Sequence, residues 1–398
     1  MPNLPRHNDY AGAAHIHSTY SDGTARVPEI AAAGARAGLD FILFGDHNTL
    51  DARRDGEEIW QAGNRVLIII GSEITCSEGH LLAYDTPLSF FPAPHDAVEC
   101  MKAIHACGGY GYIALPCDLK GHWGDYSLRQ PGIGIELNLS SIARTKINVP
   151  GFLMALLRYR GKDPLSAYSF IAGRPDDELK LWDTMLAEAV RRDERLPQIV
   201  GCLDAHAVMR IFGREWPYPS YEESFRTLRT HVLTTEALSF SNETVERDID
   251  VVHDALRNGR CYASYDNFGD PRGFLVELRH KGEYVGTTGT TYEIGPDAQQ
   301  GSYVLAVRAP RTRTVIRIIR DGLQVVSRRG GALDYPVTQP GIYRVEVLIY
   351  RRRVGNLCFG ARPWIFSNAL HVKLRQPSPA SKPSASTLSL STDPPETD

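Results

Sequence analysis

The sequence lacks the features of several specialised protein classes. Its 398 residues include no apolar run close to the roughly 20 residues that a bilayer-spanning helix needs. The opening residues MPNLPRHNDY contain no hydrophobic segment of a secretory signal, so we expect a cytoplasmic protein without membrane contact. The seven cysteines are scattered and form no C-x-x-C pair, which is typical of a reduced compartment and argues against a disulfide framework.

The chain also lacks an excess of charge of either sign. It has 44 basic and 47 acidic residues, for a net charge of −3 at pH 7. Because binding to nucleic-acid phosphates requires clustered Lys and Arg, we expect a small-molecule substrate and no nucleic-acid partner. The hydrophobic fraction of 42% is ordinary for a globular protein, and the length allows a large barrel plus a second domain. Nothing in the sequence indicates an oligomeric state.

Strand-like and helix-like stretches alternate over residues 8–268. The strand-like stretches are AAHIH, FILFGDHN, RVLIIIGSEIT, YGYIALP, GIGIELN and QIVGCLDAH, and residues 51–63 are among the expected helices. Continuous apolar strands flanked by amphipathic helices predict a parallel sheet covered on both faces, and so many units favour a closed α/β barrel. Residues 144–176 interrupt this rhythm as an expected helical insertion, and RCYASYD (260–266) is expected to close the domain.

The pattern changes after residue 272. Residues 272–375 contain alternating β-strands separated by Gly, Pro and Asp turns, with no helix between them. This pattern predicts a small antiparallel β-sandwich domain. The last segment, 376–398, is rich in Pro, Ser and Thr and is expected to be disordered because it offers little apolar surface to bury.

Imidazoles and carboxylates recur at the ends of the predicted strands. In HIH, His15 and His17 stand two residues apart and therefore face the same side of a strand. The same spacing joins Asp204 to His206 in LDAH. Further candidates follow other strands or turns: Asp22, Asp46, His47, Glu73 and His80. Because functional sites of α/β barrels lie at the carboxyl ends of the strands, one pocket could collect all of them.

This donor set predicts a metal centre. Imidazole and carboxylate ligands without clustered Cys suit Zn, Mn or Fe. Five histidines and three acids exceed one tetrahedral site, which indicates a multinuclear centre with Glu73 as a bridge. Each residue alone has an ordinary structural interpretation, and only their joint occurrence favours metal. The other histidines are expected to be structural: His7, His95, His105, His231, His253, His280 and His371.

Taken together, these motifs resemble a known family. HIHSTYSDG, GDHN, GSEIT, EGH and LDAH are similar, in order and spacing, to the motifs of the PHP (polymerase and histidinol phosphatase) domain over about residues 8–265. The resemblance implies a distorted (β/α)7 barrel with a di- or trinuclear metal site. ALRNGRCYAS and the β-rich extension ending RPWIFSNALHV are similar to the carbaryl-hydrolase-like branch.

The resemblance also implies a role for each ligand. It groups them around a first, a second and a third ion as follows: His15, His17, Glu73 and Asp204; Asp22, His47 and His206; Glu73 and His80. Glu73, Asp204 and His206 are the expected catalytic residues, and the expected cofactors are two or three divalent ions (Zn, Mn or Fe). Asp46, Glu136 and Asn138 are expected behind the ligands, with Asp46 orienting a ligand imidazole.

The pattern fails at one position. Leu115 stands where the family has a histidine for the third ion, and leucine cannot ligate. Cys117, Asp118 or His122 would be the replacement, and otherwise the centre is binuclear. Weaker candidates for substrate contacts are four basic residues, each of which is more typical of a solvated surface: Arg144, Lys146, Arg158 and Arg160.

We therefore predict a hydrolase that uses metal-activated water, first of all a phosphoesterase acting on a small phosphorylated substrate. One alternative is a carbamate, ester or amide hydrolase of the carbaryl-hydrolase type. A phosphatase pocket would be lined by Arg and Lys, whereas an aryl-ester hydrolase would offer apolar walls. A second alternative is a non-catalytic metal-binding scaffold, for which Leu115 is the only support. A nucleic-acid proofreading role is disfavoured by the weak basic charge.

Overall fold

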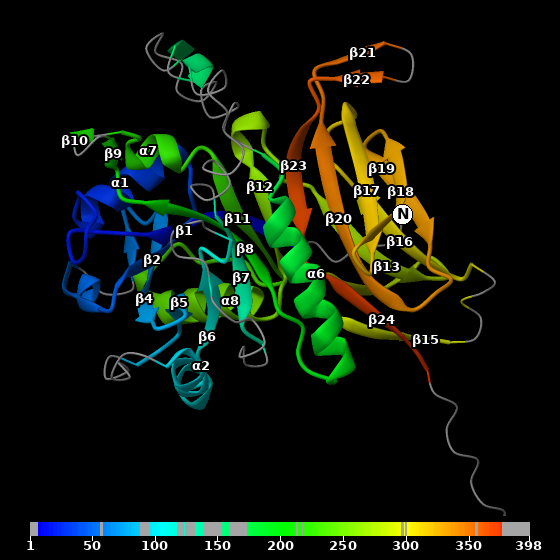
Figure 1. Cartoon of the computed structure of the whole chain (residues 1–398), viewed down its shortest axis with the longest axis horizontal. Coiled ribbons are helices and arrows are strands. Elements are labelled where there is room, and N and C mark those ends of the chain that lie inside the picture. Colours follow the sequence, from blue (N-terminus) through cyan, green and yellow to red (C-terminus); the bar gives the residue numbers. More distant parts are fainter. Residues whose placement is uncertain are drawn as a thin grey trace, which may run out of the picture.

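A closed barrel and an antiparallel layer of strands lie side by side in the computed structural model of the chain (Figure 1). The structure describes residues 7–55, 59–87, 96–117, 123, 132–138, 153–155, 157–158, 173–211, 214–216, 218–295, 298, 301–354 and 357–375. Most of the expected insertion and the whole of the expected disordered tail lie outside the described residues, and 153–155 and 157–158 are helical.

Seven strands of the large sheet close on themselves to form the barrel, because the last of them, β8, pairs again with β1. In spatial order they are β1 (Asn8–Ile16), β2 (Phe41–His47), β4 (Val66–Cys76), β5 (Gly79–Tyr84), β6 (Tyr110–Ala114), β7 (Gly134–Asn138) and β8 (Ile199–Ala205). Neighbouring strands are parallel except at β5. The barrel therefore gathers the ends of several strands at one rim.

The expectation of a wholly parallel sheet is wrong at β5. This strand is antiparallel to both β4 and β6. Only Ser77 and Glu78 join it to β4, and a parallel crossover needs a far longer connection. The hairpin reverses the chain, so the first residues of β5 lie at the rim where the other strands end. His80 consequently pairs with Thr75 on β4 and Ala114 on β6.

Two apolar clusters hold the barrel together because strand side chains alternate between its two faces. Phe41 and Leu43 belong to the cluster that fills the barrel, whereas Ile42 and Phe44 meet the covering helices. The helices are α1 (Val27–Ala37), α2 (Ala97–Ala106), α6 (Asp176–Arg191), α7 (Tyr221–Ser224) and α8 (Val245–Arg257). Helix α1 ends at Gly38, whose φ of 76° is the left-handed conformation that glycine readily adopts.

The helix expected over 51–63 does not form. A short 3-10 helix, η1 (Asp51–Asp55), is followed by β3 (Trp60–Gln61), which pairs antiparallel with the start of β4. Trp60 is buried and its indole nitrogen donates to Asp248 on α8 at 2.9 Å. Burial of this large side chain against α8 thus overrides the helical pattern.

The sheet continues from the barrel into the C-terminal part of the chain. The first half of β1 pairs with β11 (Leu228–Thr234), which pairs with β12 (Cys261–Tyr265), and β12 pairs with β23 (Arg362–Ser367). β8 thus closes the barrel, and β12, the strand expected at the end of this domain, joins the barrel sheet to the C-terminal strands. Figure 1 shows β12 beside β23, between the two groups of strands.

The C-terminal strands form two sheets over a shared apolar core. The small sheet has the order β14 (Glu283–Thr287), β13 (Leu275–His280), β16 (Tyr303–Arg308) and β19 (Ala332–Pro336). Facing it are β15 (Thr291–Ile294), β17 (Thr314–Arg320), β18 (Leu323–Arg329), β20 (Gly341–Ile349), β23 and β24 (Leu370–Leu374). Only β15 and β24 pair in parallel within the described part of this region. Two separate hairpins are β9–β10 (Met209–Ile211, Arg214–Trp216) and β21–β22 (Arg352–Val354, Leu357–Phe359).

None of the helices in the described ranges is long and apolar enough to cross a lipid bilayer.

Candidate metal centre

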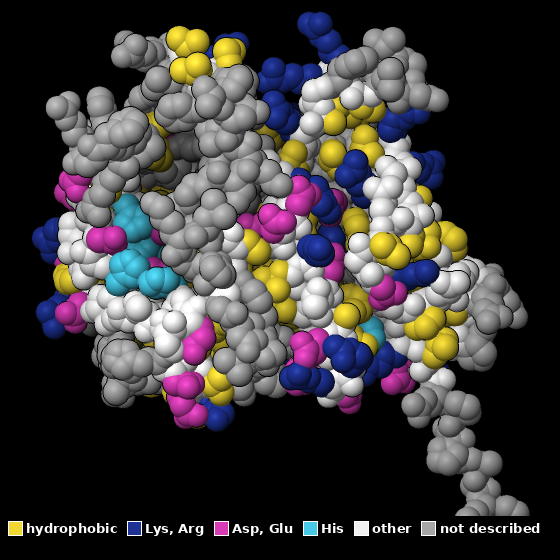
Figure 2. Space-filling view, in the orientation of Figure 1, with side chains coloured by type: hydrophobic (Ala, Val, Ile, Leu, Met, Phe, Trp, Pro, Cys, Tyr) yellow, Lys and Arg dark blue, Asp and Glu magenta, His cyan; other side chains and the backbone are white. Residues whose placement is uncertain are grey.

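All eight predicted ligand residues converge at the rim of the barrel. His17 directly follows β1, His47 ends β2, and Glu73 lies opposite His47 near the end of β4. His80 reaches the same rim from the start of β5, and Asp204 and His206 do so from the end of β8. Figure 2 shows histidine side chains gathered with acidic ones on the barrel half of the visible face. The barrel topology therefore brings together residues that are up to 191 positions apart.

The backbone at this rim departs from regular strand geometry. His15, Leu115 and Asp204 have φ angles of 62°, 48° and 54°, in the left-handed region that side chains other than glycine rarely adopt. The pairing of β1 with its neighbours shifts register between Ala14 and Ile16. His15 and His17 do meet, with ring centroids 5.0 Å apart, but through this distorted strand end and not through regular alternation.

Glu73 is the central carboxylate of the cluster and is almost fully buried. Its Oε2 atom lies 3.0 Å from Nδ1 of His47 and 3.3 Å and 3.5 Å from Nε2 of His15 and His17. Its other oxygen, Oε1, lies 3.6 Å from Nδ1 of His80. One carboxylate thus faces four imidazoles and has both oxygens available to separate partners.

Asp204, at the end of β8, faces two of these imidazoles. Its Oδ1 atom is 3.4 Å from Nε2 of His17 and 3.7 Å from Nε2 of His15. Nδ1 of His206 lies 3.7 Å away and also contacts the main-chain oxygen of Asp204 at 3.0 Å. Asp204 therefore lies beside the imidazoles of His15, His17 and His206.

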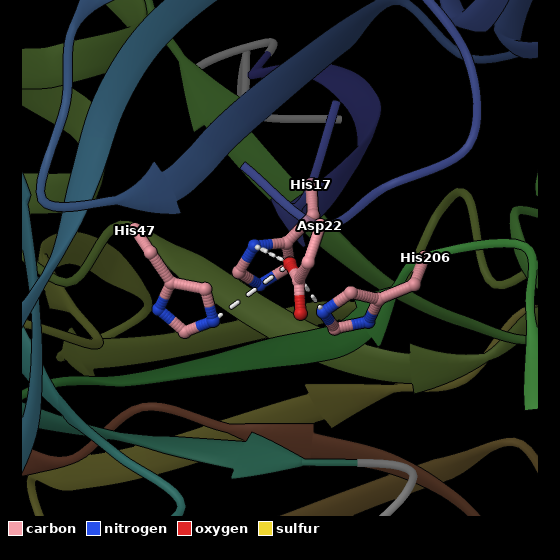
Figure 3. A group of neighbouring side chains, drawn as sticks. All are labelled: His17, Asp22, His47 and His206. Atoms are coloured by element: carbon pink, nitrogen blue, oxygen red, sulfur yellow. Dashed lines mark ion pairs between the residues drawn. The ribbon is translucent and has the colours of Figure 1, made fainter. Parts of the chain in front are cut away.

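Asp22 forms the centre of a second group (Figure 3). Its Oδ1 atom lies 3.1 Å from Nε2 of His206, 3.4 Å from Nδ1 of His17 and 3.8 Å from Nε2 of His47. Its side chain is 41% exposed, so this group opens to solvent. The stacked rings of His17 and His206, with centroids 4.0 Å apart, connect it to the first group.

The donor set fits metal ions. Three groups have ligand atoms that all lie within 4.8 Å of one another: His17, Asp22, His47 and His206; His15, His17 and Glu73; His47, Glu73 and His80. Two ligands about 2.1 Å from one tetrahedral ion lie about 3.4 Å apart, which matches the separations around Glu73 and Asp204. Among the described residues, the buried Nε2 atoms of His15 and His17 and Nδ1 of His80 have no hydrogen-bond partner. Such buried nitrogens need a partner, and a metal ion would supply it.

The charges of the cluster support this interpretation. Burial opposes ionisation, but the surrounding imidazoles lower the pKa of Asp22 and of Asp204 below the usual range. Burial also opposes charge on His15, but the carboxylates of Glu136 and Glu73 outweigh it and raise its pKa well above the usual value. Burial lowers the pKa of His17. The acids are therefore ionised at neutral pH and favour cations around them.

Glu136 and Asn138 stand behind the ligands, at the end of β7. Nδ1 of His15 lies 2.7 Å from Oε2 of Glu136. The other oxygen of Glu136 accepts from the Leu115 main-chain N–H at 2.7 Å and from the Asn138 amide at 2.8 Å. A carboxylate that accepts at Nδ1 leaves Nε2 of His15 free to ligate.

Asp46, expected behind a ligand imidazole, contacts two serines of the loop after β1. Its carboxylate accepts from the Ser18 N–H at 2.7 Å, from the Ser18 hydroxyl at 2.7 Å and from the Ser21 hydroxyl at 2.6 Å. These contacts hold the loop after β1. Among the described residues, Asp46 is connected to an imidazole only through Ser21, whose Oγ is 3.4 Å from Nδ1 of His17. Sequence reasoning missed both serines, although they stand inside the motif HSTYSDG.

Of the three replacement ligands proposed for Leu115, the structure describes only Cys117. Cys117 belongs to none of the three metal-competent groups formed by the described residues. Burial, together with the Glu178 and Asp177 carboxylates, raises the pKa of the Cys117 thiol to about 12, whereas a ligating cysteine must be a thiolate. Asp118 and His122 lie outside the described residues.

The weaker candidates for substrate contacts cannot be placed at the cluster either. Arg158 is exposed on a helical segment, and Arg144, Lys146 and Arg160 lie outside the described residues.

Comparison with known proteins gives only distant similarities. No family model and no curated protein sequence matches the chain. A crystal structure of a two-domain protein from Bacteroides vulgatus, containing a predicted PHP-like metal-dependent phosphoesterase, is 15% identical, with 93% of this chain and 97% of that chain covered and a TM-score of 0.41. A protein from Bifidobacterium adolescentis, proposed to be a metal-dependent phosphoesterase, is 13% identical, with 51% and 88% covered and a TM-score of 0.29. At these values the function has to be inferred from the residues of the site.

Proposed function

We propose that the protein is a metal-dependent hydrolase of the PHP type that cleaves the ester bond of a small phosphorylated substrate. The observation that carries this proposal is the convergence of five imidazoles with the carboxylates of Asp22 and Glu73 on one rim, where Asp204 lies beside two of the imidazoles and buried ring nitrogens lack a hydrogen-bond partner among the described residues. Divalent ions held there would lower the pKa of coordinated water and withdraw charge from a phosphoryl oxygen.

The ligands divide most simply between two ions. A neutral imidazole binds one ion through one nitrogen, so His17 and His47, which each belong to two of the three groups, can serve only one ion each. One assignment gives each of two ions at least three ligands. His15, His17, Glu73 and Asp204 bind the first ion, and Asp22, His47 and His206 bind the second. Among the described residues, only Glu73 is then left to share a third ion with His80. The neighbouring strand, β6, is followed by Leu115, which cannot ligate. We therefore infer two firmly held ions and an incomplete third site.

The charge of this centre favours an anionic substrate. Two divalent ions bring four positive charges next to the three ligand carboxylates of Asp22, Glu73 and Asp204, while the carboxylates of Asp46 and Glu136 lie behind the ligands. The positive charge is therefore concentrated on the ions, at the positions that a substrate oxygen would occupy. A phosphate ester is attracted to such a site, whereas a neutral carbamate gains nothing from its charge.

The chain's own residues have distinct parts in this proposal. Glu136 orients His15 through Nδ1, and Asp46 fixes the loop that carries Asp22. Because no complete ligand set includes His80, its imidazole, which is 28% exposed at the rim, is available to donate a proton to the leaving oxygen.

A metal and substrate panel tests the proposal. The protein is loaded separately with Mn, Zn and Fe, metal per chain is measured, and turnover is assayed with p-nitrophenyl phosphate, bis-p-nitrophenyl phosphate and a naphthyl carbamate. We expect phosphate-ester turnover that His17→Ala and Asp204→Ala abolish together with bound metal, while His105→Ala on α2 retains both.

Two outcomes of the panel contradict the proposal. Turnover of the carbamate without turnover of either phosphate would support the carbaryl-hydrolase type instead. Bound metal without turnover of any of the three compounds would favour the non-catalytic scaffold.

A further inference from the structure

The loop between β1 and α1 carries Asp22, and this residue has little packing of its own. Its side chain is 41% exposed, yet one of its oxygens points at three imidazoles. A side chain so exposed is positioned by the main chain that bears it, because few neighbours restrict its rotamers. The contacts that hold residues 18–25 therefore decide whether Asp22 is available as a ligand.

Asp46 holds one side of this loop through Ser18 and Ser21, and a tyrosine holds the other. Tyr221, the first residue of α7, is buried, and its hydroxyl donates to the main-chain oxygen of His17 at 2.7 Å. The same hydroxyl oxygen accepts from the Thr24 N–H at 3.1 Å. The side chain of Tyr221 thus joins His17, before the loop, to Thr24, near its end. Tyr221 is 204 positions away from His17 in the sequence.

The same group of contacts includes His206, another proposed ligand of the second ion. The Tyr221 hydroxyl lies 3.2 Å from the main-chain oxygen of His206. That oxygen accepts from the Thr24 N–H at 3.2 Å and from the Thr24 hydroxyl at 3.1 Å. The main chains that carry His17, Asp22 and His206 are therefore tied together around one hydroxyl group.

Gly23 shows how closely these segments approach. A Cβ atom at this position would lie 2.2 Å from the His17 main-chain oxygen and 2.7 Å from the Tyr221 hydroxyl. Any larger residue would have to push the loop away from both. The glycine that follows Asp22 in the SDG motif is thus required for space, and its role depends on the position of Tyr221.

We propose that Tyr221 is a positioning residue of the metal centre, whose hydroxyl ties the loop of Asp22 to the main chains of His17 and His206, so that Asp22 and His206 lie at the separation that the second ion requires. This inference rests on the proposed function, since it presupposes that these residues bind an ion. Tyr221 acts through main-chain atoms and contacts neither the ion nor the substrate.

Cobalt binding to Tyr221→Phe tests this inference, because Co²⁺ reports each occupied site through its visible absorption. Phenylalanine keeps the buried ring and removes only the hydroxyl, so the fold is retained. We expect one Co²⁺ to bind as in the unmodified protein, and the other to bind at least tenfold more weakly with a changed absorption band. Gly23→Ala should weaken the same ion, since it forces apart the same segments.

Tyr265→Phe is the matched control. Tyr265 is also fully buried, and its hydroxyl also donates to a main-chain oxygen, that of Gly173 at 2.9 Å, outside the cluster. Two Co²⁺ ions bound by Tyr221→Phe with unchanged affinity and spectrum would overturn the inference, as would an equal loss in Tyr265→Phe. Metal binding to the unmodified protein is measured separately. If that protein binds no Co²⁺, Mn²⁺ or Zn²⁺, the proposed function itself fails.

Discussion

Nδ1 of His15 lies 2.7 Å from Oε2 of Glu136, and both side chains are fully buried. Because Glu136 already accepts two hydrogen bonds from the chain at its other oxygen, it accepts here as well, and the proton of His15 stays on Nδ1. Nε2 is then the nitrogen that faces Glu73 and Asp204. This pair sets the tautomer of His15, one of the proposed ligands, from the side of the ring that faces away from Glu73.

Replacement of Glu136 by Gln should weaken binding of the first ion by about 10- to 100-fold. The amide oxygen would keep the bonds from Leu115 and Asn138, so its NH₂ group would face Nδ1 and force the proton onto Nε2. Metal affinity by calorimetry measures the effect. Glu277→Gln, at a fully buried carboxylate paired with Arg279 in the C-terminal sheet, is the control. Equal affinities for the two variants would contradict the role of Glu136.

Removal of His80 should separate proton transfer from metal binding. We expect His80→Ala to retain two ions per chain and to lose roughly 10²-fold in kcat, as for a general acid. His47→Ala should lose one ion, because His47 completes the group around Asp22. Elemental analysis after gel filtration counts the ions. Loss of an ion from His80→Ala would instead indicate a completed third site.

Asn368 joins the C-terminal strands to the strand that carries Asp204. Its side-chain oxygen accepts from the Ile199 N–H at 2.8 Å, and its NH₂ group lies 3.0 Å from the main-chain oxygens of both Ile199 and Cys261. Asn368→Ala leaves these buried groups without partners and should lower the free energy of unfolding by about 3 kcal/mol. Urea denaturation measures this change. Asn8→Ala, which removes one 3.4 Å bond, is the control and should cost far less.

His231 should make the free energy of unfolding decrease as the pH becomes alkaline. Its ring lies between Asp9, 2.8 Å from Nδ1, and Asp266, 3.2 Å from Nε2. Burial opposes its charge, but Asp266 and Asp9 raise the pKa of His231 from 6.5 to about 9. A raised pKa means that the charged form stabilises the fold, so this contribution is complete below pH 6.5 and is lost as the pH rises through 9.

The loss should amount to about 3 kcal/mol between pH 6 and pH 10. Urea denaturation of the metal-free protein at several pH values measures it, and the difference from His231→Gln isolates the histidine from other titrating groups. An unchanged pH dependence in that variant would show that His231 is not the group responsible.

Local motifs were sufficient to identify side chains that lie together at the rim of the barrel. His15, His17 and the acid of SDG are close in sequence, and strand ends identified the rest because a barrel brings such ends to one rim. The strand character of β2, β4 and β8 followed from continuous apolar runs. Motif spacing and apolar runs are properties of short segments, so they can be read directly from the order of the residues.

Long-range packing decided what the sequence could not show. The pairing of β12 with β23 depends on strands about 100 residues later in the chain. Trp60 forms a strand because α8 buries it, against its local helical pattern. In each case the free energy comes from partners that are distant in the sequence, so no local pattern records it.

The roles of the residues behind the ligands divide in the same way. The types and order of the ligand side chains in this protein were determined by the sequence alone. That Asp46 holds a loop, that Glu136 sets a tautomer and that Tyr221 ties His17 to His206 was decided only by the tertiary structure. A ligand is recognised by its own chemistry, whereas a supporting residue is defined by a contact, and contacts exist only once the chain has folded.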